Sequence, residues 1–381
     1  MIGALTASHV FDGVQMHRNA VVGMDCDGRI IALWRDGEAV PPECRLIDCG
    51  AGILAPGFVD LQVNGGDGVM VGADTDVDQL RRICDAHARL GACAILPTLI
   101  TDRPEVVRRV LAAGISAARA GVAGFAGLHL EGPHLDPRRK GAHDAALIRP
   151  MTEADLALLV QAARDLPALM VTLAPEAATP DQIHRLAGAG VIVSLGHSGC
   201  SAAQVHAAQA AGARCVTHLY NAMGPMLGRE PGLVGAALAL DLHAGIIADG
   251  VHVAPECLQV ALATKATDRL FLVSDAMAVA GSSLDSFQLG GRRVVRSGGR
   301  LTLEDGTLAG ADVSLAQSVA HLAALGVPLE RALAMASRIP ADLIGARDRG
   351  RIARGARADL VCLTPQLELQ KVWRSGRAPG G

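Results

Sequence analysis

Aromatic side chains are scarce in this sequence, which holds five Phe, two Trp and one Tyr among its 381 residues. Surfaces that bind single-stranded nucleic acids stack the bases on such rings. The charges nearly balance as well, because 35 Lys and Arg face 38 Asp and Glu, a net charge of −3 with neutral His. This composition argues against a general polyanion-binding surface, and we expect no nucleic-acid partner. One local phosphate site stays compatible with it.

Long apolar runs and paired cysteines are also missing. Half of the residues are hydrophobic, yet no uninterrupted run reaches the ~18–20 residues that a membrane-spanning helix needs. The best candidate, Leu233 to Ile247, is interrupted by Asp241 and His243. The first residues show no basic segment followed by an apolar core, and the nine cysteines include no Cys-x-x-Cys pair. We therefore expect a cytoplasmic protein with reduced thiols and no membrane partner.

Short apolar runs alternate with Ala-rich helical stretches from Gly57 onward. Eight runs predict buried strands, at 57–63, 92–97, 124–130, 168–173, 191–195, 214–217, 245–248 and 270–274. Helices are predicted at 77–90, 104–120, 153–163, 180–189, 201–211 and 255–264. Eight such alternations over about 220 residues predict an α/β fold, a (β/α)8 TIM barrel. A doubly wound open sheet is disfavoured, because no Gly-x-Gly-x-x-Gly motif follows the first strand.

The two chain ends have a different pattern. Short apolar segments separated by turn residues fill positions 1–55, and the tail contains a further turn and strand. Neither end is long enough for its own core, so we expect one small β-sandwich-like domain from 1–55 plus 345–381, beside a barrel spanning 56–344. The Gly-, Ser- and Arg-rich stretch 282–308 predicts an inserted hairpin, followed by helices at 311–325 and 329–337.

Four polar residues come directly at the ends of predicted strands: Glu131, His197, His218 and Asp275. In a TIM barrel the carboxyl ends of the strands form the active-site face. Two histidines and one carboxylate are typical of a catalytic metal site with an open position. A separate aspartate across the mouth suits a general base acting on water.

Other histidines and cysteines lie near the same face. His143 and His252 fall in loops after the third and seventh strands, where both could face the mouth. His129 lies inside the third strand, where ligation and support of the ligands both stay open, with support favoured. We expect Cys200 and Cys215 to be inert buried thiols.

The sequence resembles the amidohydrolase superfamily, and within it the N-acetylglucosamine-6-phosphate deacetylases. The matching segments follow the family order along nearly the whole chain: Pro56-Gly-Phe-Val-Asp-Leu-Gln-Val-Asn-Gly65, Leu96-Pro-Thr-Leu-Ile-Thr101, His129-Leu-Glu-Gly-Pro133, Lys140-Gly-Ala-His143, Gly196-His-Ser198, Thr217-His-Leu-Tyr-Asn-Ala-Met223, Asp249-Gly-Val-His252, Ser274-Asp-Ala276 and Leu308-Ala-Gly310. The segments beginning at His129 and Thr217 are highly specific, whereas Gly-His-Ser alone is not.

The resemblance implies a divalent metal ion held by Glu131, His197 and His218, and we expect one ion per subunit. It also implies that Asp275 is the catalytic acid and base and that His143 lies near the acetyl carbonyl. Zinc is the first expectation, with iron, cobalt or manganese as alternatives, because two imidazoles and a carboxylate suit all of them.

The resemblance further implies a set of substrate contacts and an assembly. The expected contacts are His252 beside the sugar, Asn221, Ala222 and Arg229 at the 6-phosphate, and Leu308, Ala309 and Gly310. An arginine with backbone donors suits a phosphate dianion. Members of the family are typically homodimers.

We therefore expect hydrolysis of N-acetyl-D-glucosamine 6-phosphate to D-glucosamine 6-phosphate and acetate, in amino-sugar catabolism. A relative acting on N-acetylgalactosamine 6-phosphate is the alternative enzyme. A catalytically silent scaffold is disfavoured, because the three ligands and the base are all present.

Two positions depart from the family patterns. Many amidohydrolases carry His-x-His after the first strand, and here Gln62-Val-Asn64 takes its place, which predicts one metal ion rather than two. His134 stands where an apolar residue is expected and adds an imidazole near the mouth.

Overall fold

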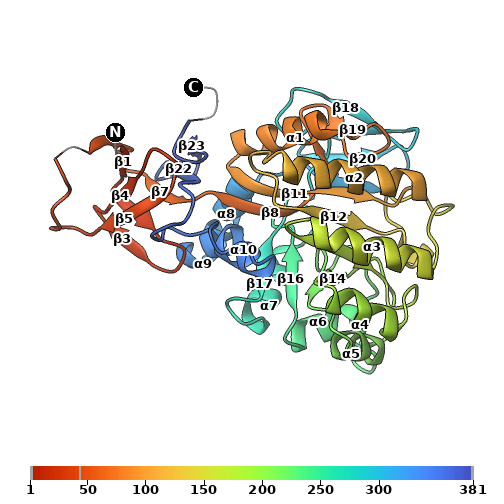
Figure 1. Ribbon diagram of the computed structural model, residues 1–381. Coiled ribbons are helices and arrows are strands. Elements are labelled where there is room, and N and C mark those ends of the chain that lie inside the picture. The colour runs from red at the N-terminus through yellow and green to blue at the C-terminus, as the bar shows by residue number, and fades with distance from the viewer. Residues whose placement is uncertain (1–2, 43, 379–381) are drawn as a thin grey trace.

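The computed structural model describes residues 3–42 and 44–378. Its centre is an eight-stranded parallel sheet whose strands neighbour one another in chain order (Figure 1). These strands are β8 (Phe58–Val63), β11 (Ala92–Ile100), β12 (Leu128–Glu131), β13 (Leu169–Leu173), β14 (Ile192–Leu195), β15 (Cys215–Val216), β16 (His243–Ile246) and β17 (Leu270–Leu272). The order and the intervening helices confirm the predicted TIM barrel.

Helices follow the barrel strands and pack on the outside of the sheet. They are α1 (Val77–Arg89), α2 (Pro104–Arg119), α3 (Glu153–Asp165), α4 (Pro180–Gly188), α5 (Ala202–Ala210), α6 (Gly232–Ala239), α7 (Pro255–Thr264), α8 (Leu315–Ala324), α9 (Leu329–Ala336) and α10 (Arg338–Leu343), with a 3-10 turn at Pro137–Arg139. Capping boxes start α3, α4, α5 and α8, where a Ser or Thr and a side chain three residues later satisfy each other's backbone donors.

The sequence did not predict α6 or α10. Helix α6 buries residues around most of its circumference, among them Leu233, Val234 and Leu238, so its sequence lacks the one-sided apolar stripe that marks a surface helix. The third strand was predicted from residue 124, but β12 begins at Leu128 because Gly124 and Gly127 have φ of 86° and 141°, outside the extended region.

Strands from both chain ends share a sheet beside the barrel. The five-stranded sheet runs β23-β22-β7-β2-β3 and the four-stranded sheet runs β5-β4-β1-β6. Their bounds are β1 (Gly3–Thr6), β2 (His9–Phe11), β3 (Met16–Arg18), β4 (Val21–Met24), β5 (Ile30–Trp34), β6 (Arg45–Asp48), β7 (Ile53–Pro56), β22 (Leu360–Leu363) and β23 (Leu369–Trp373). Their apolar side chains, including Leu5, Val22, Leu54 and Leu360, form a separate core. In Figure 1 the red and blue strands lie together at one end of the molecule.

The region predicted as one inserted hairpin is a four-stranded antiparallel sheet. It contains β18 (Ser286–Leu289), β19 (Arg292–Ser297), β20 (Arg300–Leu303) and β21 (Leu308–Ala311). Leu289, Val294 and Leu301 pack against Met277 in a small core of their own. Two short strands, β9 (Gly65–Gly66) and β10 (Val69–Met70), form a hairpin after β8.

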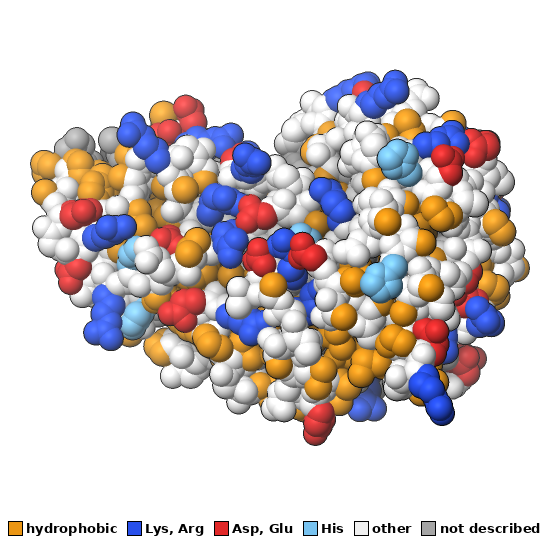
Figure 2. Space-filling view, turned by 90° about the horizontal axis from the view of Figure 1, so that it is seen from below, with side chains coloured by type: hydrophobic (Ala, Val, Ile, Leu, Met, Phe, Trp, Pro, Cys, Tyr) orange, Lys and Arg blue, Asp and Glu red, His pale blue; other side chains and the backbone are white. Residues whose placement is uncertain are grey.

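The surface and the helix lengths agree with the composition. Figure 2 shows Lys and Arg mixed with Asp and Glu over the face that it presents. Within the described ranges, no helix is both long enough and apolar enough to span a bilayer. The apolar stretch Leu233 to Ile247 is divided between α6 and β16.

Candidate active site and metal centre

A cavity of about 540 Å³ opens at the carboxyl ends of the barrel strands. Its lining includes Glu131, His143, His197, His218 and Asp275, together with Asn64, Asn221, Ala222, His252, Leu308 and Gly310. Residues from β8, β12, β14, β15 and β17 or the loops that follow them therefore meet at one mouth, as the positions of the strand ends predict.

The backbone is unusual at three of the residues that follow strand ends. His197, His218 and Asp275 follow the ends of β14, β15 and β17 with φ of 47°, 29° and 49°. Residues other than glycine seldom adopt this left-handed conformation, which costs of order 1–3 kcal/mol and tends to occur at functional sites. The chain turns sharply there, and each side chain lines the cavity instead of continuing along the barrel wall.

Three side-chain atoms converge around the Glu131 carboxylate. Glu131 Oε1 lies 3.0 Å from His218 Nε2 and 3.3 Å from His197 Nε2. His197 Nδ1 donates to the Arg139 carbonyl at 2.8 Å, so its proton sits on Nδ1 and its Nε2 lone pair faces Glu131. Burial opposes the charge of Glu131, but the adjacent imidazoles of His197 and His218 bring the pKa of its carboxyl well below the usual value. This donor set fits a divalent cation such as zinc.

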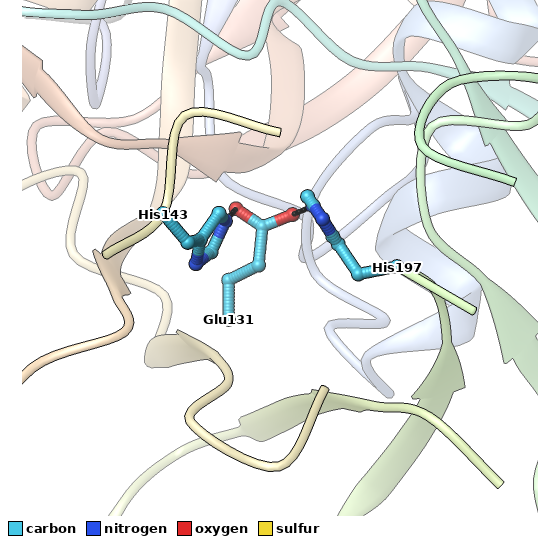
Figure 3. Close-up of side chains that lie close together, drawn as sticks. All are labelled: Glu131, His143 and His197. Carbon is cyan, nitrogen blue, oxygen red and sulfur yellow. Dashed lines mark ion pairs between the residues drawn. The ribbon is translucent and has the colours of Figure 1, made fainter. Parts of the chain in front are cut away.

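His143 approaches the same carboxylate from the other side. Figure 3 shows Glu131 between His143 and His197, whose ligating atoms all lie within 4.8 Å of one another. Thr101 contacts His143 Nδ1 through its backbone N–H at 3.3 Å and through its hydroxyl at 2.8 Å. Because the backbone N–H can only donate, we assign the His143 proton to Nε2, which lies 3.8 Å from Glu131 Oε2. Burial, with the nearby His197, lowers the pKa of His143 to about 3. His143 Nε2–H is thus a neutral hydrogen-bond donor and offers no lone pair to a metal ion. The Nδ1 atom of His218 has no hydrogen-bond partner in the described part of the chain.

Asp275 lies across the mouth and is partly buried. Burial, with the charge of Glu131, raises the pKa of its carboxyl to about 6. Gln62 Nε2 and Asn64 Nδ2 both donate to Asp275 Oδ1, at 3.1 and 2.7 Å. A carboxyl group that titrates near neutral pH is suited to accept and return a proton.

His129 and His134 have structural partners. His129 Nδ1 donates to the Leu61 carbonyl at 3.0 Å and its Nε2 accepts from Thr172 Oγ1 at 2.7 Å, so neither nitrogen is available to a metal. These bonds favour a role for His129 in supporting the metal ligands over a role as a ligand itself. His134 was expected near the mouth, and that expectation is wrong: it lines a different cavity, and its Nδ1 donates to the Arg149 carbonyl.

The expected substrate residues fall into two groups. Asn221, Ala222, His252, Leu308 and Gly310 line the cavity. Ala309 is buried in the core of the inserted sheet, and Arg229 is exposed outside the cavity lining. His252 Nδ1 lies 2.6 Å from Asp249 Oδ2, and its Nε2 is buried with no partner among the described residues. Ala222 has a φ of 53°, and its backbone N–H has no backbone acceptor in that part of the chain.

Sequence reasoning missed two arginines that line the cavity, Arg138 and Arg139. Arg138 pairs with Asp136 at 2.9 Å and Glu176 at 3.7 Å. Arg139 lies against Gly199 and Gly224, and within residues 3–42 and 44–378 it forms no ion pair. The signal was the pair Arg138-Arg139, directly before the Lys140-Gly-Ala-His143 segment.

Comparison with known proteins places this site in a family. The model of the amidohydrolase family matches residues 53–378, and the chain belongs to that family. It is 42% identical over 349 residues, 91% of this chain and 86% of the relative, to an N-acetylgalactosamine-6-phosphate deacetylase of Shewanella sp. (strain ANA-3). It is 34% identical over 343 residues, 87% of this chain and 89% of the relative, to an N-acetylglucosamine-6-phosphate deacetylase of Haemophilus influenzae.

Solved structures give the same result. The crystal structure of N-acetylglucosamine-6-phosphate deacetylase from Pasteurella multocida superposes with a TM-score of 0.94 at 31% identity, covering 99% of both chains. A mutant of the Mycobacterium smegmatis enzyme in complex with N-acetyl-D-glucosamine-6-phosphate superposes with a TM-score of 0.91 at 33% identity, again covering 99% of both.

Proposed function

We propose that the protein is a metal-dependent deacetylase that hydrolyses the amide of N-acetyl-D-glucosamine 6-phosphate to D-glucosamine 6-phosphate and acetate, in amino-sugar catabolism. The observation that carries this proposal is the convergence of Glu131, His197 and His218, with Asp275 across the same mouth. Relatives named as deacetylases of amino-sugar 6-phosphates align over most of this chain and support the substrate class.

The metal set that we propose is Glu131, His197 and His218, with one zinc ion per chain. His143 is left out of the set because its Nε2 carries a proton. When bound there, a divalent cation would supply Lewis-acid chemistry: it would polarise the acetyl carbonyl and lower the pKa of the attacking water.

The proton transfers fall to Asp275. Its raised pKa lets it take a proton from the attacking water and return it to the departing amine nitrogen near neutral pH. His143 Nε2–H donates to the acetyl oxygen as negative charge develops there, since a neutral donor held in a buried site needs no reorganisation at that moment.

The phosphate end of the substrate lies, in this proposal, beside Asn221, Ala222 and Arg139. The unpaired Ala222 N–H and the Arg139 guanidinium offer donors to a dianion. Arg229 stays a predicted phosphate contact, although it does not line the cavity of this chain. The β21 residues Leu308 and Gly310 cover the sugar from the inserted sheet.

N-acetyl-D-galactosamine 6-phosphate is the second candidate substrate. The relative that carries this name is 42% identical to the chain, against 34% for the glucosamine-named relative of Haemophilus influenzae. Acetate release from both epimers, with metal analysis of the same preparation, tests the proposal. Release from neither phosphorylated sugar would contradict it, and the ratio of kcat/KM values assigns the epimer.

A homodimer in the cytoplasm completes the proposal. Met226, Leu227 and Val260 are 57%, 58% and 45% exposed. Met226 and Val260 border an apolar cavity that shares Arg139 with the proposed active site. Burial of these side chains by a second copy would remove apolar surface from water. Sedimentation of the purified protein tests this assembly.

A further inference from the structure

Strand β8 directs a row of polar side chains into the barrel. Asp60, Gln62 and Asn64 lie at alternate positions and are 1%, 2% and 1% exposed. Alternate residues of a strand share one face. Branched apolar side chains usually fill a barrel interior, and buried polar groups are costly unless they are hydrogen-bonded. Three such residues in a row therefore need specific partners.

Those partners lie mainly in the segment after β17. The Asp60 carboxylate accepts from the Ser274 backbone N–H at 3.2 and 3.3 Å. Gln62 Nε2 and Asn64 Nδ2 donate to Oδ1 of the next residue, Asp275. Gln62 Nε2 also donates to Glu131 Oε1 at 3.0 Å and so bridges the two carboxylates of the site.

The same row crosses the seam of the barrel. Strands β8 and β17 are the two ends of the sheet order, and in the described chain a single bridge, Val63 to Ala276, joins the segments there. The Asn64 backbone N–H adds one bond to the Ala276 carbonyl at 2.8 Å. The Ala311 backbone N–H also donates to the Asp275 carbonyl at 3.0 Å. The Asp275 carboxylate itself is held by the side-chain hydrogen bonds from Gln62 and Asn64.

We propose that Gln62 and Asn64 are positioning residues that hold Oδ1 of Asp275 and leave Oδ2 as the oxygen that exchanges protons. Because a carboxylate only accepts, both amides must turn their N–H groups toward it. Gln62 in addition sets the separation between the metal ligand Glu131 and the base. This inference rests on the proposed function, since Asp275 is the base only in that reaction.

The two amides have different contacts, which makes the proposal testable. The near-isosteric variants Asn64→Leu and Gln62→Met remove the donors with little change in volume. Asn64→Leu should lower kcat by about 10–100-fold with unchanged KM and zinc content, because among the described residues the Asn64 side chain donates to Asp275 and not to Glu131. Gln62→Met should lower kcat similarly and also weaken zinc binding by about 10–100-fold, because Gln62 contacts Glu131 as well.

Two further variants separate an effect on the position of Asp275 from a general loss of protein stability. Gln182→Met removes a buried amide whose N–H donates to the Met151 carbonyl away from the site, and kcat should stay unchanged. In the Asp275→Asn background, Asn64→Leu should cause no further loss of kcat, since it acts through Asp275. Asn64→Ala provides a second variant if Asn64→Leu does not fold.

Two results would overturn the proposal. One is an Asn64 variant with wild-type kcat, and the other is equal zinc loss in the Asn64 and Gln62 variants. Zinc titration followed by thermal denaturation needs no substrate, so the difference in zinc affinity is measurable even if the wild-type protein releases no acetate. The absence of acetate release would contradict the proposed function, but it would not contradict the contact of Gln62 with Glu131.

Discussion

His197 Nε2 and His218 Nε2 lie 3.1 Å apart, facing each other across the mouth of the barrel. The proton of His197 is committed to the Arg139 carbonyl through Nδ1, so its Nε2 presents a bare lone pair. The lone pair of His197 Nε2 points toward His218 Nε2 and Glu131 Oε1. This arrangement favours a positively charged group between the three atoms. A divalent cation would fill that role and would satisfy all three atoms.

This geometry predicts opposite results for two histidines. His218→Gln should lose most of the bound zinc, because it removes a proposed ligand. His143→Gln should keep the zinc and lose about 10²–10³-fold in kcat, because it removes a donor to the developing oxyanion. Metal content and kcat, measured on the same preparations, check both. Zinc loss in the His143 variant with retention in the His218 variant would exchange their roles.

Asp275→Asn should keep the metal and lose turnover. The amide is nearly isosteric but cannot take a proton, and a general acid–base group contributes about 10²–10⁴-fold. Steady-state rates with zinc analysis check this prediction. A variant with near-wild-type kcat would remove Asp275 from the proton transfers.

Buried Asp60 makes the stability of the metal-free protein depend on pH. Burial raises the pKa of its carboxyl from 3.8 to about 7. Because the folded state holds this proton more tightly than the unfolded state, the stabilising contribution is complete below pH about 4 and is lost as the pH rises through about 7. The Asp60→Asn variant has no such titration. Its free energy of unfolding, relative to that of the wild type, should therefore increase by a few kcal/mol when the pH is raised from 4 to 8. Urea denaturation at both pH values measures the difference, and an unchanged difference would show that folding does not raise the pKa of Asp60.

Arg139→Ala should raise KM for the phosphorylated sugar far more than for free N-acetylglucosamine. Charge-assisted hydrogen bonds contribute about 1.5–3 kcal/mol, or about 10–150-fold in binding. Arg229→Ala is the matched comparison, because that exposed side chain lies outside the cavity lining. If only the Arg229 variant discriminates between the two sugars, the phosphate contact belongs to Arg229. Equal losses on both sugars would make Arg139 structural.

The sequence predicted the barrel and the meeting of four polar residues at its mouth, because each terminates a short apolar run. Those runs are strong signals since barrel strands are buried on both faces. Helix α6 has no such signal, being apolar nearly all round. The bonds of Gln62 and Asn64 to Asp275 join residues 213 and 211 positions apart, and only closure of the barrel brings them together. The cavity position of Arg139 depends likewise on two distant loops, at Gly199 and Gly224.

The chain should bind one catalytic metal ion and not two. A second ion beside the first needs ligands from the end of β8, and the two amides there turn N–H groups, not lone pairs, toward Asp275. Asn64 Oδ1 is unpartnered among the described residues, but one neutral amide oxygen is a weak ligand for a cation that favours imidazole, thiolate or carboxylate. Asp60 accepts from backbone N–H groups, and both nitrogens of His129 are occupied. Elemental analysis of protein purified without added metal should therefore approach one ion per chain, and anomalous scattering should show one peak beside Glu131. Two fully occupied ions about 3.5–4 Å apart would show that the β8 amides turn over to become ligands, and would contradict both the single-ion prediction and their proposed hold on Asp275.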